Sequence, residues 1–400
     1  MGPTMNLLQE ILRLSSEVIS ADQLEKMLAK AEASGEPLRV KFGIDPTFTD
    51  VHLGHAVPIR LLRLFQKAGH MPVLIIGDGT ARLGDPTGRN DQRPPLTAED
   101  VERNSATYLE QIGTIVDLTD GKCEVRRNSE WFAEMDFFDC LKLASSSTAA
   151  RLLERDDFKK RMKENLPVHL HEMMYPLMQG LDSVMVEADI ELGGNDQLFN
   201  LHMGRQMQER AGQRPQVCIT TPLLLGTDGR KMSKSYGNHV GLNADATDMY
   251  GKVMSLSDEG MADWFRLATD FDDQQIAVML AGHPREAKDK LAQTIVAAIH
   301  GIESATAAAA AFVAQFRKKE VPDDIPQKTV AVGSYSLPVL MKDIGLGQST
   351  SEARRLIQGG GLRIDGNVVN DVKHNVEILP GAEPLLLQAG KRRFVSVSPA

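Results

Sequence analysis

Two histidines three residues apart, His52 and His55, mark the first stretch of this chain that could do chemistry. With Leu53 and Gly54 they open a predicted helix, whose free backbone N–H groups and partial positive charge attract phosphate. The two imidazoles share one helical face and could donate hydrogen bonds to phosphate oxygens that gain charge in a transition state. Gly54 has no side chain, so a flat base or ribose could lie against the backbone. The alternative is a strand–helix turn with two solvated histidines.

A second stretch, residues 226–237, carries two lysines in a loop bounded by glycines. Lys231 and Lys234 are compact positive charges suited to a triphosphate, and the flanking glycines allow the loop to move. A solvated basic loop is the alternative. Found together on one chain, the two stretches favour a nucleotide site over either alternative.

The elements around the histidines predict a parallel α/β unit. Residues 38–44 are predicted as a strand, 56–68 as a helix with Pro58 in its first turn, and 70–77 as a buried strand. In such a unit the ligand lies at the carboxyl ends of the strands. Further predicted strands cover 184–190 and 217–221, and Gly193 to Gln197 are predicted to open another helix.

The rest of the pattern divides the chain into four parts. Residues 1–240 are predicted to form the α/β domain, which starts with helix from Met5 to Gly35 and contains a helical insertion at 128–165. Residues 241–320 are predicted to be helical, 321–334 a Pro-containing linker, and 335–400 a small separate unit with two short helices and an Asp-Gly hairpin.

Composition places few further limits. The 400 residues have a net charge of −9, with 42% hydrophobic and 25% charged residues, which is ordinary for a globular protein. No apolar run is long enough to cross a membrane, and we expect a cytoplasmic protein without a membrane partner. The three cysteines are far apart and indicate neither a disulfide framework nor a zinc site, so no protein metal site is expected.

The pair His52-Leu53-Gly54-His55 and Lys231-Met232-Ser233-Lys234-Ser235 resembles the two signatures of class I aminoacyl-tRNA synthetases. More narrowly, the chain from about Leu38 onward resembles bacterial tyrosyl-tRNA synthetases. The resemblance implies a Rossmann-like catalytic domain, a helical anticodon-binding-like domain and a C-terminal S4-like RNA-binding domain. It also implies that tyrosine is activated with ATP, which brings Mg²⁺, and then transferred to tRNA(Tyr).

The resemblance also implies roles for single residues. The departing pyrophosphate would be stabilised by five residues: Thr47, His52, His55, Lys231 and Lys234. ATP and the adenylate would be held by Asp45, Gly54, His55, Gly194, Asp196, Met232 and Lys234. The tyrosine pocket would consist of Gly43, Asp85, Tyr175, Gln179, Asp182 and Gln197.

Asp182 decides the amino acid in this interpretation, because it would accept the phenolic hydroxyl of tyrosine. Tyr175, Gln179 and Asp182 match a Tyr-x-x-x-Gln-x-x-Asp pattern of tyrosyl enzymes, with Asp182 at the end of a helix predicted for 170–179. The chain departs from the family at Lys41, where many tyrosyl enzymes carry a second tyrosine that contacts the phenol.

The C-terminal unit carries eight Lys and Arg against six Asp and Glu, although the whole chain is acidic. Its resemblance to S4 domains implies contacts with tRNA. The residues expected to make such contacts, with one from the catalytic domain, are Arg89, Arg354, Arg355, Arg363 and Lys373. A merely solvated face explains each of these side chains as well.

The insertion at 128–165 has two interpretations. In the resembled family it forms a homodimer contact, whereas its composition fits a core-packing helical insert equally well. Three other functions stay open from the sequence: a tryptophanyl-tRNA synthetase, a synthetase-derived RNA-binding protein without activity, and a small-molecule adenylating ligase. Intact signatures and the C-terminal unit favour the tyrosyl enzyme over all three.

Overall fold

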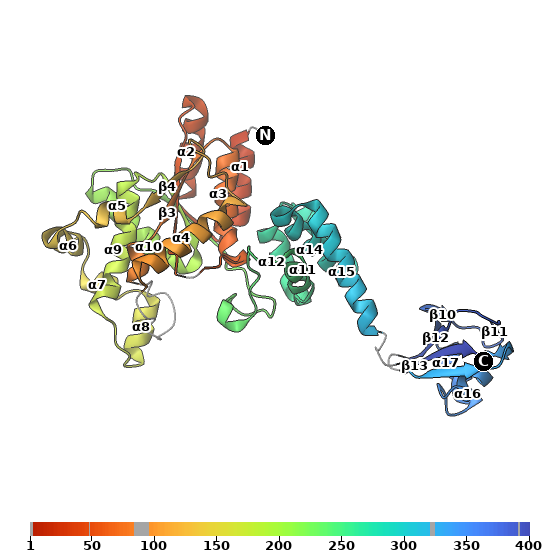
Figure 1. Cartoon of the computed structure of the whole chain (residues 1–400). Coiled ribbons are helices and arrows are strands. Elements are labelled where there is room, and N and C mark those ends of the chain that lie inside the picture. The colour runs from red at the N-terminus through yellow and green to blue at the C-terminus, as the bar shows by residue number, and fades with distance from the viewer. Residues whose placement is uncertain (1–2, 48, 84–95, 321–324, 391–392) are drawn as a thin grey trace. The chain divides into compact units, whose positions relative to one another are not determined.

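A computed structural model describes residues 3–47, 49–83, 96–320, 325–390 and 393–400 (Figure 1). The chain forms two compact units, one that ends at Ala308 and one that comprises Ala309–Ala400. Among the described residues, no helix is both long and apolar enough to span a membrane.

A six-stranded sheet organises the first unit, in the order β1-β6-β5-β2-β3-β4. The strands are β1 (Glu17–Ile19), β2 (Arg39–Ile44), β3 (Met71–Ile76), β4 (Glu124–Arg127), β5 (Ile190–Gly194) and β6 (Val217–Thr221). Strands β2 to β6 are parallel to their neighbours, and β1 runs antiparallel to β6. The predicted α/β class with a mainly parallel sheet is therefore confirmed.

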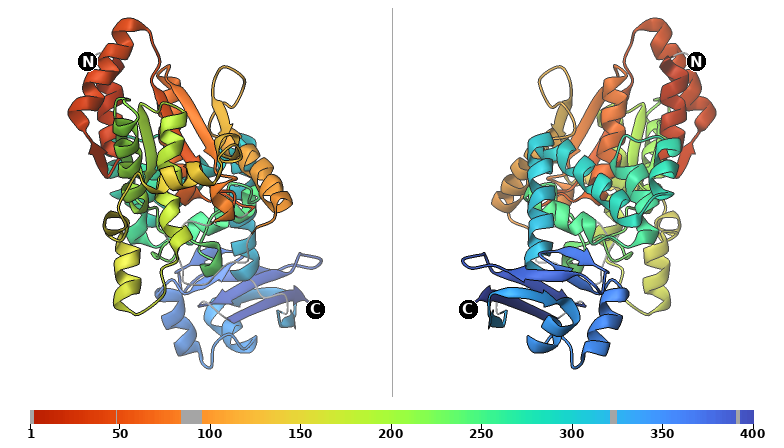
Figure 2. Two further views of the ribbon diagram at one scale, coloured as in Figure 1. Left: turned by 90° about the vertical axis from the view of Figure 1, so that its left-hand side faces the viewer. Right: turned by 90° about the vertical axis from the view of Figure 1, so that its right-hand side faces the viewer.

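Helices surround this sheet. The larger ones are α1 (Pro3–Leu14), α2 (Ala21–Ser34), α3 (Leu53–Lys67), α4 (Ala98–Gly113), α9 (Leu170–Met185) and α10 (Leu198–Arg210). Helix α3 packs against β2 and β3, and α10 packs against both β5 and α9. Figures 1 and 2 show α1 and α2, coloured red, side by side at one edge of the unit.

The insertion at 128–165 is helical, as the sequence predicts. It contains α5 (Ser129–Phe132), α6 (Phe137–Ala144), α7 (Ala149–Leu152) and α8 (Asp156–Lys163). Its buried residues Leu143 and Leu152 share a core with Leu177 and Met178 of α9.

Helices also follow the sheet, over the part predicted as a separate helical domain. They are α11 (Ala246–Met254), α12 (Met261–Ala268), α13 (Asp273–Leu280), α14 (Pro284–His300) and α15 (Ile302–Glu320). The part of this block up to Ala308 lies in the first unit with the sheet, and α15 continues past Ala308 into the range of the second unit. The indole of Trp264 on α12 donates a 3.0 Å hydrogen bond to the backbone oxygen of Leu225, next to the lysine loop.

The second unit has its own apolar core, built on helices α16 (Leu337–Asp343) and α17 (Thr350–Gln358). Its strands are β7 (Gln327–Val330), β8 (Gly333–Ser336), β9 (Leu362–Ile364), β10 (Asn367–Val369), β11 (Asn375–Ile378), β12 (Leu385–Ala389) and β13 (Arg393–Pro399). The expected hairpin joins β9 to β10, and Asp365 and Gly366 at its turn both have positive φ, as a type I′ turn requires.

Four sequence-based expectations need correction. Strand β1 interrupts the helix expected from Met5 to Gly35, because its residues pair with the open edge of β6. The strand expected at 184–190 starts only at Ile190, since α9 continues to Met185. Pro58 lies inside α3 beyond its first turn. Finally, the predicted linker 321–334 contains β7, which pairs in parallel with β13 of the second unit.

Candidate active site

The two signature stretches meet at the carboxyl edge of the sheet. His52 is the N-terminal cap residue of α3 and is bridged to Gly241 in the segment that follows the lysine loop. Leu53 N–H donates to the Val240 oxygen at 2.9 Å, and Leu242 N–H donates to the Val51 oxygen at 2.8 Å. The start of α3 and the end of the lysine loop are therefore held together by backbone hydrogen bonds.

His52 and His55 stack with ring centroids 3.7 Å apart. Burial, assisted by the neighbouring positive groups, lowers the pKa of His52 to about 2 and that of His55 to about 4. The Nδ1 atoms of both rings are buried and have no hydrogen-bond partner among the described residues. Both side chains are therefore neutral at pH 7, and neutral imidazole still offers one N–H donor.

Gly54 brings the lysine loop close to the histidines. A Cβ atom at this position would lie 3.0 Å from the His52 ring and 3.6 Å from the sulfur of Met232. A side chain here would therefore crowd the His52 ring at the start of α3.

Both signature lysines face carboxylates. Lys231 Nζ lies 3.5 Å from Asp196 Oδ2, and Lys234 pairs with Asp50, which also accepts a 2.6 Å hydrogen bond from Asn243. Hydrogen bonds from Lys234 and Asn243 keep the pKa of Asp50 below its usual value despite its partial burial. Lys231 and Lys234 are thus exposed side chains that each lie beside a carboxylate.

Asn238 is the buried residue that shapes the lysine loop. Its amide donates to Asp228 Oδ1 at 2.7 Å and to the Lys231 oxygen at 3.2 Å, and it accepts from Ser233 N–H at 2.9 Å. No motif in the sequence indicates Asn238, because the contacts that define its role come from the folded loop.

Asp45 and Tyr175 are brought together by the fold. Tyr175 donates its hydroxyl hydrogen to Asp45 Oδ2 at 2.8 Å, and Thr80 donates to Asp45 Oδ1 at 2.7 Å. A Cβ on Gly77 would lie 2.0 Å from Asp45 Oδ1, so a glycine is needed beside this cluster. Tyr175, Thr80 and the end of β2 thus form one polar wall.

Asp182 lies inside α9 rather than at its end, and it is buried. Trp131 donates to Asp182 Oδ1 at 3.0 Å, and Asn128 donates to Asp182 Oδ2 at 3.4 Å and to Thr80 at 3.0 Å. Burial raises the pKa of Asp182 to about 7, against the opposing charge of Lys41 and these hydrogen bonds. Asn128 and Trp131 belong to no motif in the sequence, although their position just after strand β4 was a usable signal.

Gln179 and Gln197 contact other polar residues. Gln179 donates to Glu191 Oε1 at 3.2 Å, and Gln197 accepts from Asn200 at 2.8 Å. Glu191 also forms a buried ion pair with Lys41.

The remaining predicted residues divide by location. Gly43 is the penultimate residue of β2, Thr47 follows this strand, and Gly194 ends β5 two residues before Asp196. Asp85 and Arg89 lie outside the residues that the structure describes. The four C-terminal residues, all exposed and all in the second unit, are Arg354, Arg355, Arg363 and Lys373.

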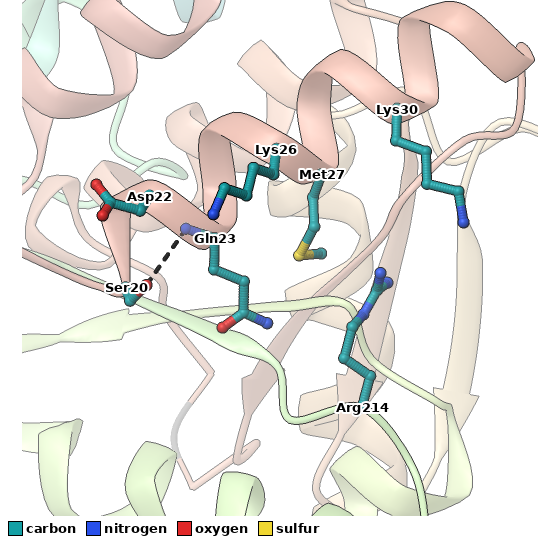
Figure 3. Close-up of a pocket in the computed structure, with 7 residues that line it drawn as sticks. All are labelled: Ser20, Asp22, Gln23, Lys26, Met27, Lys30 and Arg214. Atoms are coloured by element: carbon teal, nitrogen blue, oxygen red, sulfur yellow. Dashed lines mark hydrogen bonds between the residues drawn. The ribbon is translucent and has the colours of Figure 1, made fainter.

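A hollow on the first unit has none of these residues in its lining (Figure 3). It is lined by Ser20, Asp22, Gln23, Lys26, Met27, Lys30 and Arg214. Within the described parts of the chain, no group of three or more His, Cys, Asp or Glu side chains could hold a metal ion.

Comparison with known proteins places the chain in a family. A family model described as tRNA synthetases class I (W and Y) matches residues 33–317. A tyrosine–tRNA ligase of Idiomarina loihiensis is 47% identical over 397 residues, which cover 97% of each chain. The chain belongs to the tyrosine–tRNA ligase family. Another member, from Moorella thermoacetica, is 46% identical and covers 95% of this chain and 92% of its own length.

Two further comparisons support the architecture of this tyrosine–tRNA ligase family member. An S4 domain model matches residues 336–383, within the second unit. The solved structure of the Archaeoglobus fulgidus tyrosyl-tRNA synthetase complexed with L-tyrosine has a TM-score of 0.61, with 22% identity, and covers 76% of this chain and 99% of that one. At this identity the likeness supports the fold alone, and it confirms the expected class I architecture.

Proposed function

We propose that this protein is a tyrosine–tRNA ligase that forms tyrosyl-adenylate from tyrosine and ATP and then transfers tyrosine to the terminal ribose of tRNA(Tyr). The observation that carries the proposal is the meeting of the His52–His55 helix start with the lysine loop. The buried carboxylate of Asp182 is linked through Asn128 and Thr80 to Asp45, at the end of the strand that precedes this helix start. The histidines and lysines offer donors for a triphosphate, and Asp182 offers an acceptor for a phenol.

In the activation step the tyrosine carboxylate attacks the α-phosphorus of ATP, and negative charge builds on the departing pyrophosphate. Stabilisation of that charge needs donors and cations rather than a general base. His52 and His55 would donate as neutral imidazoles, because their low pKa values exclude a role as acids near pH 7. Lys231 and Lys234 would exchange Asp196 and Asp50 for phosphate oxygens, with Thr47 as a further donor.

The adenosine would lie against Gly54 and Met232, since Gly54 has no side chain of its own to hold a flat base away from the backbone. Gly194 and Asp196 at the end of β5 would hold the ribose, since an aspartate accepts from two hydroxyls. Asp45 lies at the end of the adjacent strand, which suits contact with the adenylate. Mg²⁺ would be bound by the ATP phosphates and would help to neutralise them.

The amino acid would lie above α9 and the polar wall. Asp182 would accept the phenolic hydroxyl, while Tyr175 and Gln179 would meet the ammonium together with Asp85. Gly43 and Gln197 would flank the carboxylate end. Since the Asp182 carboxylate is already buried, a ligand without a hydroxyl cannot compensate it.

The second unit would bind tRNA. Arg354 and Arg355 on α17, with Arg363 and Lys373, are exposed cations suited to a phosphate backbone, and Arg89 would add a contact from the first unit. All of these partners occur in the cytoplasm, where we place the reaction.

We further propose a homodimer formed through the insertion at 128–165. On α6 the side chains of Phe137 and Phe138 are 71% and 75% exposed, and Leu141 beside them is 50% exposed. Adjacent exposed aromatic residues of this kind are typical of a protein interface. Phe137→Ser with Phe138→Ser should therefore convert a dimer into a monomer of 43.9 kDa in sedimentation. A wild-type mass near this value at every concentration would contradict the dimer.

The function is tested by ATP–pyrophosphate exchange without tRNA, in the presence of tyrosine, tryptophan or phenylalanine. Exchange with tyrosine alone is expected. Exchange with tryptophan would show that the amino-acid pocket is wrongly assigned while the nucleotide site stands. Absence of exchange with all three would reject the enzyme and favour a protein that only binds RNA.

A further inference from the structure

Lys41 and Glu191 face each other across neighbouring strands beneath the proposed tyrosine pocket. They are register partners in the parallel pair β2 and β5, and their charged groups lie 2.9 Å apart. The side chains are 0% and 1% exposed. A buried ion pair gains little stability over apolar residues of similar volume, so this one calls for a functional explanation.

Lys41 has no donor left for a substrate. Its ammonium bonds Glu191, donates to Ser183 Oγ at 2.7 Å and to the backbone oxygen of Gln179 at 3.0 Å. An ammonium has three N–H groups, and these three partners use them all. Many related enzymes carry a tyrosine residue at this position, which contacts the phenol of the substrate. Lys41 therefore does not replace that contact. It holds α9 at Gln179 instead.

Glu191 controls how Gln179 is turned. A carboxylate can only accept hydrogen bonds, so Gln179 must direct its NH₂ group at Glu191, 3.2 Å away. Glu191 is itself fixed by Lys41, by Ser183 at 3.1 Å and by Gln216. The amide oxygen of Gln179 is consequently turned away from the buried pair, on a side chain that is partly exposed.

We propose that the buried Lys41–Glu191 pair is a positioning device that orients the Gln179 amide so that its oxygen accepts a hydrogen bond from the ammonium group of the amino-acid substrate. This inference rests on the proposed function, since it requires an amino acid above α9. Lys41 and Glu191 are positioning residues that do not touch the substrate.

The pair also balances charge beside Asp182. The Lys41 ammonium lowers the pKa of Asp182 and the Glu191 carboxylate raises it. A lone lysine or a lone glutamate at this depth would alter the phenol site as well, so both charges must be removed together in a test.

The double variant Lys41→Met with Glu191→Leu removes the acceptor that orients Gln179 and leaves no buried charge unpaired. Affinity is measured with three probes: tyrosine, tyramine (which lacks the carboxylate) and 3-(4-hydroxyphenyl)propionate (which lacks the ammonium). We expect tyrosine and tyramine to bind about tenfold more weakly, as for one hydrogen bond to a charged group. The propionate should bind within about twofold of its wild-type affinity, since it never meets Gln179 through an ammonium.

Equal weakening of tyramine and the propionate would overturn the inference, because a general distortion of the pocket affects both. Unchanged binding of tyramine would also overturn it. The matched control is Arg39→Met with Glu124→Leu, which removes the 2.6 Å ion pair between β2 and β4 two residues earlier on β2. This control should leave all three affinities unchanged.

Gln179→Ala supplies a second test that does not depend on the folding of the double variant. It should weaken tyramine about tenfold and spare the propionate, and normal tyramine binding by Gln179→Ala would overturn the inference. If the wild-type protein showed no pyrophosphate exchange with tyrosine, tryptophan or phenylalanine, the proposed function itself would be wrong. If it is active with tyrosine and the variants show no selective loss, only the positioning role is wrong.

Discussion

Asp182 is the single side chain on which the proposed choice of amino acid depends. Its burial and its bonds to Asn128 and Trp131 hold a carboxylate in a fixed place before any substrate arrives. A fixed acceptor discriminates more sharply than an apolar pocket, because a ligand without the hydroxyl leaves it unpaired.

Asp182→Ala should therefore reduce the preference for tyrosine over phenylalanine. The expected loss in the ratio of kcat/KM values is about 10- to 100-fold, the effect of one hydrogen bond to a charged group. Pyrophosphate exchange with both amino acids measures it. Glu172→Ala, on the same helix but in an ion pair with Arg161, is the control. If Asp182→Ala still preferred tyrosine over phenylalanine as strongly as the wild type, Asp182 would not be the residue that binds the phenol.

His52 and His55 connect the site to stability. In the unfolded chain a histidine binds a proton near pH 6.5, whereas in the fold these two stay neutral to about pH 2 and about pH 4. Between these values the unfolded state binds more protons, so stability falls as the pH decreases below about 6.5. Asp182 acts in the opposite direction, because its raised pKa favours the folded state as the pH falls from 7 toward 4.

The contribution of His55 to the pH dependence of the free energy of unfolding is the difference between the wild type and His55→Gln. From pH 8 to pH 5 the wild type should lose about 2 kcal/mol more of its free energy of unfolding than the variant. Denaturation by urea, followed by tryptophan fluorescence, reports on the first unit because Trp131 and Trp264 both lie in it. Parallel pH curves for the two proteins would mean that His55 is not held neutral.

At the scale of elements, the lysine loop depends on the close approach between Gly226 and Asn238. A Cβ on Gly226 would lie 2.4 Å from the Asn238 side chain and 2.8 Å from its backbone oxygen, so the loop would have to move. We expect Gly226→Ala to slow activation about 100-fold, as for a reacting group displaced by an ångström, with little effect on tyrosine binding.

Gly251→Ala is the matched control for this loop substitution. Gly251 lies in α11, where a Cβ would meet no atom within 4 Å. The Gly251→Ala protein should have the same activity in pyrophosphate exchange as the wild type. A Gly226→Ala protein with normal exchange would show that the loop does not need its present shape.

The sequence predicted best those elements whose signal is local. The hairpin at Asp365-Gly366 follows from its turn residues, and the start of α4 is marked by an equally local signal, the capping box in which Thr97 accepts from Asp100 N–H. Strand β1 could not be predicted in the same way. It has only three residues, and its partner β6 (Val217–Thr221) follows much later in the sequence.

The same limit applies within the site. Local motifs identified His52, Lys231 and Asp182, whose roles stay predictions. The bond from Tyr175 to Asp45 and the Lys41–Glu191 pair depend on which strands and helices become neighbours, and no spacing along the chain encodes that. Continuation of α9 to Met185 was missed because the apolar run after Asp182 suits a strand equally well.

At the scale of the molecule, the chain separates into a unit with the proposed activation site and a unit with its own core. A chain that ends at Glu320 should therefore keep pyrophosphate exchange within about twofold of the full-length value, since every described site residue remains. Aminoacylation should fall by at least about tenfold through loss of tRNA binding.

The matched experiment on the full chain is the pair Arg354→Ala and Arg355→Ala on α17. If each arginine meets one phosphate, the slope of log affinity for tRNA against log salt should become shallower by about 2. An unchanged slope would mean that these arginines do not contact tRNA phosphates and form only a solvated face.

The pairing of β1 with β6 has a consequence during synthesis of the chain. About 200 residues separate the two strands, so at about 5–20 residues per second a ribosome makes β6 roughly 10–40 s after β1. Until then β1 has no partner, and the lysine loop, which follows β6, does not yet exist. A polypeptide released before Leu242 lacks the backbone hydrogen bond from Leu242 to Val51 beside the start of α3, so we expect that shortened chain, unlike one that ends at Glu320, to show no ATP–pyrophosphate exchange.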